Sequence, residues 1–168
     1  TASAAGQGRV GLVESGNGTG GDARILVTGA GTGFTSPQTT VIAAGIGGGS
    51  ISARFFGTIL SANGGNGTGN IAVLSFGTDT GSSVSAGAVS INASGTGGDA
   101  NGDGSTGGNA VGGDVLVEAN GGGTIALSQL IVDASATSGG ASSASSGGNT
   151  ALAGNAEGGS AFVQASNV

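Results

Sequence analysis

The chain has 168 residues, of which 41 are Gly, and it contains no Cys, His, Met, Trp, Tyr or Lys. Without these side chains the sequence excludes the usual zinc, haem and iron–sulfur ligand sets, a cysteine nucleophile, a Ser-His-Asp triad, a P-loop and a Schiff base. Nine carboxylates oppose three arginines, for a net charge of −6, which disfavours nucleic-acid and membrane-surface partners.

Helix is disfavoured because glycine interrupts nearly every segment, at a cost of about 1 kcal/mol per helical position relative to Ala. In residues 1–68, short β-branched and apolar segments predict strands of irregular spacing. These strands are expected at 9–13, 23–28, 39–43, 50–56 and 58–61. Pro37 lacks an amide donor, so we expect a corner at this residue.

Residues 69–168 show a more regular pattern of short apolar segments. They predict strands at 71–75, 84–86, 89–93, 115–119, 124–127, 130–134 and 161–165. The apolar alternation changes phase between Leu127 and Leu130, which indicates a corner between two strands. Glycine and asparagine at such corners would supply positive φ angles.

The same segments recur along the chain. Residues 113–119 align with 159–165 at an offset of 46, Gly69 aligns with Gly113 at 44, and residues 16–20 align with 65–69 at 49. Internal repetition is typical of a solenoid. Three strands within about 20 residues predict coils of a right-handed parallel β-helix. We expect one continuous all-β solenoid, less regular in residues 1–68 and repeating in residues 69–168.

Two long glycine-rich segments, residues 95–113 and 138–159, each follow the third predicted strand of a unit. This equivalent placement predicts insertions at one corner of the coil. Two alternatives remain for their conformation. They are either flexible loops or extended, polyproline-like strands packed side by side, which dense glycine permits because no Cβ blocks the approach of backbones.

Residues 112–127, Gly-Gly-Asp-Val-Leu-Val-Glu-Ala-Asn-Gly-Gly-Gly-Thr-Ile-Ala-Leu, and residues 130–136, Leu-Ile-Val-Asp-Ala-Ser-Ala, carry a family resemblance. They resemble the coils of filamentous-haemagglutinin-type exoproteins, which bacteria export by two-partner secretion. The resemblance covers residues 69–168 well and 1–68 weakly. The chain departs from the family in its longer glycine-rich insertions and in lacking the secretion-signal domain. The resemblance implies a β-helix, an extracellular or cell-surface location and an adhesin function.

The segment from Asp99 to Gly104 is the most specific chemical motif. Asp99, Asn101 and Asp103 place oxygen ligands at alternate positions, with Gly at the sixth, as at the start of a calcium-binding loop. The twelfth position, where such a loop has Glu, is Ala110. The alternatives are a calcium site on these three residues and a polar turn. No other cofactor is expected.

Catalysis is not expected. The acids Glu14, Glu118 and Glu157 are scattered, and no cation follows Arg54 to stabilise developing negative charge. Glu118 is expected to point outward into water. The adjacent rings of Phe55–Phe56 lie on opposite faces of a strand, so one is exposed unless a second protomer or an insertion covers it.

Asn17, Asn66 and Asn92 match the N-glycosylation pattern, and we interpret these matches as chance in a chain rich in Asn, Ser and Thr. No apolar run is long enough for a transmembrane helix. No signal-peptide pattern precedes the first strand, and the chain starts at Thr1, so we expect a mature or excised piece of a longer protein.

These observations favour a non-catalytic structural segment of an extracellular fibre or adhesin. Solenoid ends expose unpaired strands, so we expect end-to-end self-association into a filament or continuation in a longer repeat array. The alternative is a carbohydrate- or ice-binding module that uses a flat β-helix face, with surface glycans as partners. Regular Thr-x-Thr ladders, which would favour ice binding, are absent from the sequence. Neither nucleic-acid binding nor membrane insertion is expected.

Overall fold

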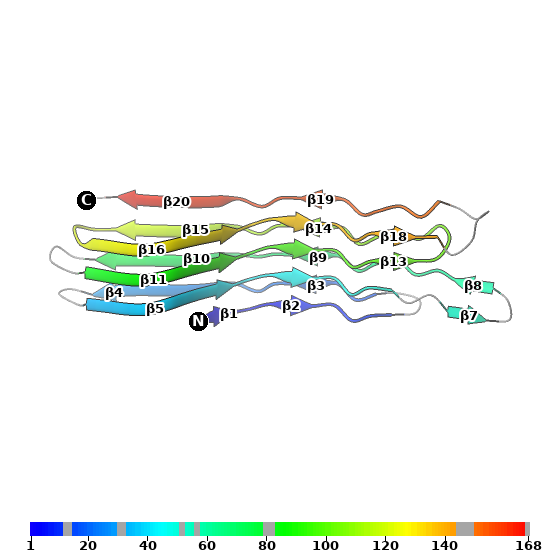
Figure 1. The fold of residues 1–168 in the computed structure, drawn as a ribbon, viewed down its shortest axis with the longest axis horizontal. Coiled ribbons are helices and arrows are strands. Elements are labelled where there is room, and N and C mark those ends of the chain that lie inside the picture. The colour runs from blue at the N-terminus through cyan, green and yellow to red at the C-terminus, as the bar shows by residue number, and fades with distance from the viewer. Residues whose placement is uncertain are drawn as a thin grey trace.

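The computed structural model describes residues 1–11, 15–29, 33–50, 53–55, 58–78, 83–143 and 150–166. In this part of the chain the protein is all-β, with no helix and 59% strand. Parallel strands form several sheets, an arrangement consistent with a β-helix or solenoid. The rows of strands are stacked one above another, with the N-terminal row at the bottom (Figure 1). Among the described residues, no helix is long and apolar enough to cross a membrane.

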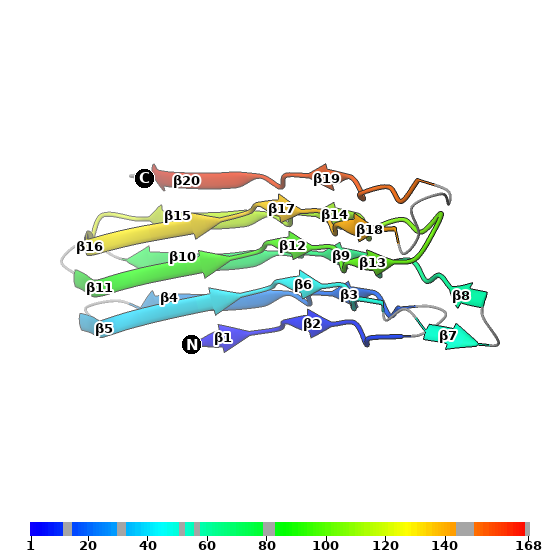
Figure 2. The same ribbon diagram turned by 45° about the vertical axis from the view of Figure 1, so that its right-hand side comes forward.

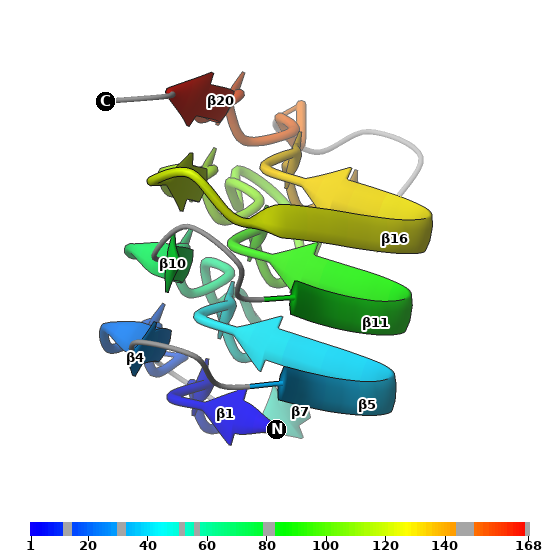
Figure 3. The same cartoon turned by 90° about the vertical axis from the view of Figure 1, so that its left-hand side faces the viewer.

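Two long sheets face each other across an apolar core. The first long sheet consists, in spatial order, of β1 (Ala2–Ser3), β5 (Gly33–Ile42), β11 (Ser83–Asn92) and β16 (Thr124–Asp133). The second long sheet consists of β4 (Ala23–Gly29), β10 (Ala72–Thr78), β15 (Val115–Asn120) and β20 (Ala161–Ser166). Neighbouring strands in both sheets are parallel. Viewed from one end of these strands, the two sheets form two columns (Figure 3).

Each long sheet belongs to a layer that continues into a region of two-residue strands, which we call the glycine half (Figure 2). The first layer contains the first long sheet, and the second layer contains the second. In one layer lie β2 (Gly6–Gln7), β6 (Gly45–Ile46), β12 (Gly95–Thr96) and β17 (Ala136–Thr137). In the other lie β3 (Gly18–Thr19), β9 (Gly67–Thr68), β14 (Ala110–Val111) and β19 (Ala156–Glu157). Further along, β13 (Ala100–Asn101) pairs with β18 (Ala141–Ser142). An antiparallel hairpin of β7 (Ala53–Phe55) and β8 (Thr58–Leu60) projects beyond them.

One coil therefore runs out along the first layer and back along the second. Equivalent residues in the second layer are 49, 43 and 46 positions apart along the chain. The last two coils of the first layer are offset by 41. The predicted coil of about 20 residues is wrong. The sequence offsets of 46 and 49 match the coil-to-coil register, whereas the offset of 44 is one residue too long because Gly67 pairs with Ala110.

The glycine-rich segments are not insertions at one corner, and this prediction is corrected. Residues 95–113 carry β12, β13 and β14, and the described part of 138–159 carries β18 and β19. Each segment thus forms part of the glycine half of its own coil. Of the two conformational alternatives, strands packed side by side match the described residues, because these strands pair with those of neighbouring coils.

β16 is one continuous strand, although the sequence predicted a corner between Leu127 and Leu130. The phase change is instead a local shift within the strand, since the paired register passes from Leu127 to Gln129 without Ser128. Pro37 occupies the equivalent place in β5 and lies inside that strand, not at a corner. Figure 3 shows that β5, β11 and β16 all bend.

The core lies between the long sheets as columns of stacked side chains. Leu74, Phe76, Val89, Ile91 and Val115 are almost completely buried. In one column, Leu74 of β10 lies between Ile25 and Val117 of the neighbouring strands. Because each column is narrow, a small number of large apolar residues is enough to fill it.

The glycine half has backbone, not side chains, in its interior. A Cβ on Gly67 would lie 2.0 Å from the carbonyl oxygen of Thr96, and one on Gly95 would lie 2.1 Å from that of Val111. These partners belong to the opposite layer, so the two backbones are in direct contact. Among the described glycines, only Gly102, Gly104 and Gly121 have positive φ. Close approach, more than corner geometry, therefore explains the glycine content.

A zigzag of backbone hydrogen bonds joins the two layers of the glycine half. From Gly48 onward, each participating glycine donates its N–H to the carbonyl of the preceding one in the opposite layer, with N···O distances of 2.9 to 3.1 Å. The participating residues are Gly16, Gly48, Gly65, Gly98, Gly108, Gly139 and Gly154. These bonds cross-link the two layers in addition to the hydrogen bonds within each sheet.

Candidate functional site

The apolar core is open at the C-terminal end of the described residues. β20 is the top strand of the second long sheet, and no described strand lies opposite it in the first (Figure 3). Val163 of β20 is 58% exposed, whereas Leu74 and Val117 in the same column are 0% and 4% exposed. The hollow beside it has a volume of about 450 Å³. Its lining residues are Phe76, Val117, Ala119, Ile125, Leu127, Leu130, Val163, Gln164 and Ala165.

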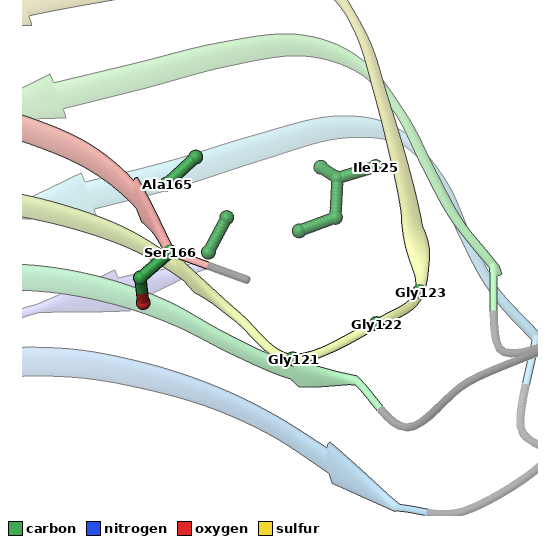
Figure 4. Close-up of a pocket in the computed structure, with 7 residues that line it drawn as sticks. Gly121, Gly122, Gly123, Ile125, Ala165 and Ser166 are labelled. Carbon is green, nitrogen blue, oxygen red and sulfur yellow. The ribbon is translucent and has the colours of Figure 1, made fainter. Parts of the chain in front are cut away.

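A second hollow of about 310 Å³ adjoins the first, at the turn that connects β15 to β16. Gly121 has a φ of 106° in this turn, a conformation that favours glycine. Ile125 of β16 and Ala165 of β20 extend toward the same space from opposite walls (Figure 4). The two hollows together make the open end a continuous trough between the edges of the two long sheets.

Both walls of this trough are sheet edges. Among the described strands, β16 pairs only with β11, and β20 pairs only with β15. The backbone N–H and C=O groups on the other side of each strand have no described strand to pair with. Such edges are ready templates for the addition of another strand.

The outward face of this end carries polar and acidic side chains beside the exposed Phe162. Side chains of β15 and the residues before it bond to those one coil above, in the pairs Asp114–Ser160 at 2.5 Å, Glu118–Gln164 at 2.8 Å and Asn120–Ser166 at 2.6 Å. Glu118 accepts the bond from Gln164, and Glu157 lies apart from it on β19, opposite Val111. The structure does not pair these two carboxylates with each other.

Two sequence predictions involve residues without a described position. Glu14 lies outside the described residues, as does Phe56. Phe55 is the last residue of β7, and its backbone pairs with Thr58. The predicted protomer contact at Phe55–Phe56 therefore stays a prediction.

An asparagine ladder runs along the second layer. Oδ1 of Asn17 accepts a bond from the amide of Asn66, Oδ1 of Asn66 from that of Asn109, and Oδ1 of Asn109 from that of Asn155. The N···O distances are 2.8 to 2.9 Å. The sequence gives Asn17 and Asn66 as glycosylation matches and as part of the repeat at an offset of 49, but it does not predict that they bond to each other. Their recurrence one coil apart was the signal that could have identified the ladder.

The structure places the predicted calcium residues beside the next coil. Oδ1 of Asp99 accepts a 2.8 Å bond from the amide of Gly140, and Oδ1 of Asn101 accepts a 2.6 Å bond from Ser142. Asp103 similarly accepts a bond from Ser143. Among the described residues, no group of three or more acidic, His or Cys side chains is placed to hold a metal ion. The calcium site stays a prediction, with these hydrogen bonds as the observed use of the three side chains.

The comparisons with known proteins give no relative from which a function could be transferred. No protein-family model, curated protein or solved structure matches the chain.

Proposed function

We propose that the chain is a non-catalytic structural segment of an extracellular fibre or adhesin, built as a right-handed parallel β-helix. It associates end to end, or continues in a longer repeat array, through the open end of its core. The observation that carries this proposal is the 58% exposure of Val163, which lies above the buried Val117 and Leu74 in the same column. Right-handedness is expected because parallel β crossovers have this hand in about 98% of cases.

The N-terminal coil has strand spacing that suits the C-terminal end. Five residues separate the starts of β3 and β4, and five also separate the starts of β19 and β20. In the structure, Ala23 and Ile25 of β4 already pair with Ala72 and Leu74 of the coil above. The β4 edge of a second copy can therefore lie on β20 with Ile25 above Val163, repeating a mode of packing that the solenoid uses internally.

Charge also supports contact between opposite ends. Residues 1–68 contain all three arginines and two carboxylates, whereas residues 69–168 contain seven carboxylates and no cation. At the N-terminal end, Arg24 is exposed and forms an ion pair of 3.4 Å with Asp22. The acidic C-terminal part of the chain therefore repels a second copy of itself more than it repels the N-terminal part, which favours head-to-tail over head-to-head contact.

The test uses two neighbouring residues of β20. Val163 and Phe162 are 58% and 59% exposed, but they lie on opposite faces of the strand, and only Val163 lines the hollow. We expect the native chain and Phe162→Asp to form filaments in electron micrographs and fast-sedimenting species, and Val163→Asp to stay monomeric. Filaments from Val163→Asp, or monomers from the native chain at high concentration, would contradict the proposal.

Ligand binding on a flat face is the second candidate function. Exposed or half-buried threonines stack across two coils on each side of the glycine half, as Thr19 on Thr68 and Thr96 on Thr137. Columns of this kind suit a carbohydrate or an ice surface. A thermal-hysteresis measurement and a glycan array on the monomeric Val163→Asp variant separate this candidate from self-association, because binding by a monomer would favour it.

A further inference from the structure

We infer that the open end is a slot for one extended peptide strand, which adds in parallel to β16 and is selected by the spacing of its apolar side chains. The inference concerns the same end of the solenoid as the proposed function and deepens it by naming the chemistry of the partner. It predicts binding by a single copy of the chain to a peptide, without any contact between copies.

The backbone of the slot follows from the first long sheet. Each strand of this sheet pairs with the next in the same way, because β5, β11 and β16 are parallel and each pair keeps one register along its length. The free edge of β16 carries backbone N–H and C=O groups in the same arrangement as the edge of β11 that pairs with β16. A strand added there would continue a pairing that the sheet already makes between its coils.

The side chains of the slot specify an unusual pattern. In both β11 and β16, four apolar residues face the core, and the phase shift separates them by two, three and two positions. In β16 they are Ile125, Leu127, Leu130 and Val132, and in β11 they are Val84, Ala86, Val89 and Ile91. A strictly alternating strand would direct its second pair of apolar residues away from the core. The bend therefore acts as a selectivity element.

The opposite wall gives the added strand a surface to bury. Val163 and Ala165 face the hollow from β20, and Phe76 and Val117 line it from below. The apolar side chains of an added strand would enter this hollow of about 450 Å³ and cover Val163. Burial of apolar area and the new ladder of hydrogen bonds would then stabilise the complex together.

The experiment uses a fluorescent ten-residue peptide with the sequence of β11, Ser-Val-Ser-Ala-Gly-Ala-Val-Ser-Ile-Asn. The control peptide omits the glycine, which turns the two-three-two spacing into strict alternation with nearly unchanged composition. Binding is measured by fluorescence anisotropy at concentrations where the chain sediments as a monomer. We expect the first peptide to bind at least tenfold more tightly and to slow hydrogen exchange in residues 124–133.

Two variants locate the binding. Val163→Asp should weaken binding of the first peptide at least tenfold, and Phe162→Asp should leave it within twofold of native. Equal unfolding midpoints for the three proteins show that the fold is intact. Equal binding of the two peptides, no binding by the native chain, or native binding by Val163→Asp would overturn the inference. Absence of filaments alongside selective peptide binding would contradict only the proposed function.

Discussion

The backbone amide of Asn66 donates a 2.8 Å hydrogen bond to Oδ1 of Asn17, which occupies the same place one coil earlier. The relationship repeats at Asn109 and Asn155, so one residue type forms a continuous ladder along the stack. Each side chain accepts the bond that its neighbour's backbone donates, and the ladder thereby sets the register between coils.

Replacement of a central ladder residue should therefore weaken the fold. Asn109→Ala removes the acceptor for the Asn155 amide and should lower the free energy of unfolding by about 1 kcal/mol. Asn109→Asp keeps an oxygen at this position and should restore most of the loss. Urea denaturation of the three proteins measures the effect. Equal losses for the alanine and aspartate variants would show that the acceptor oxygen is not the cause.

Substitution of two glycines tests whether close backbone packing or chain flexibility explains the glycine content. A Cβ on Gly108 would lie 2.0 Å from the carbonyl oxygen of Gly65, whereas a Cβ on Gly158 would meet nothing within 4 Å. We expect Gly108→Ala to lower the free energy of unfolding by about 3 kcal/mol through overpacking. Gly158→Ala should leave it unchanged or raise it by about 0.5 kcal/mol, because alanine restricts the unfolded chain. Thermal unfolding monitored by circular dichroism compares them, and similar losses in both variants would refute the packing explanation.

Two leucines test the location of the core. Leu74 is fully buried and Leu26 is 64% exposed, although both lie on long strands of the second sheet. Leu74→Ala should cost about 3 kcal/mol of unfolding free energy, because it leaves a cavity between the sheets. Leu26→Ala should change the free energy by less than about 0.5 kcal/mol. Chemical denaturation gives both values, and a large loss at Leu26 would indicate that the outward face of β4 is covered in solution.

Calcium removal tests the predicted site at Asp99, Asn101 and Asp103. If these residues bind the ion, chelation should speed proteolysis near residues 99–104, and added calcium should reverse the effect. At free calcium a hundredfold above its Kd, the gain in stability would be about 2.7 kcal/mol. Asp99→Asn should abolish the calcium dependence. Identical digestion with and without calcium would discard the site and leave the hydrogen bonds to the next coil as the role of this segment.

Much of the strand content and part of the repeat could be predicted from the sequence. Residues 161–165 and 115–119 were predicted as equivalent strands, and β20 and β15 pair at that register. The coil length could not be predicted, because the phase change at Ser128 has the same sequence pattern whether a strand bends or ends. The register between the three strands distinguishes the two cases, because it skips Gly87 and Pro37 where it skips Ser128 and then resumes at the same offset. This register is not visible in one segment alone.

The structural role of each glycine could not be predicted from the sequence either. Composition cannot distinguish a glycine that adopts positive φ, such as Gly121, from one that lets two backbones touch, such as Gly108. The open end was foreseen in general terms because solenoids expose their last strands. The spacing of Ile125, Leu127, Leu130 and Val132 is visible in the sequence, but their position on one bent strand is not. The trough at Val163 also depends on which strands lie opposite each other, and the sequence does not give this arrangement.

The zigzag of glycine hydrogen bonds affects how the stability of the fold varies with temperature. Apolar burial contributes the positive heat-capacity change of unfolding, and its stabilising effect weakens on cooling. The glycine half is joined by backbone hydrogen bonds such as those from Gly98 to Gly65 and from Gly139 to Gly108, with little apolar surface between its layers. Its contribution to stability should therefore vary less with temperature than that of the Leu74 core, and the protein should resist cold denaturation better than a solenoid filled with apolar side chains throughout.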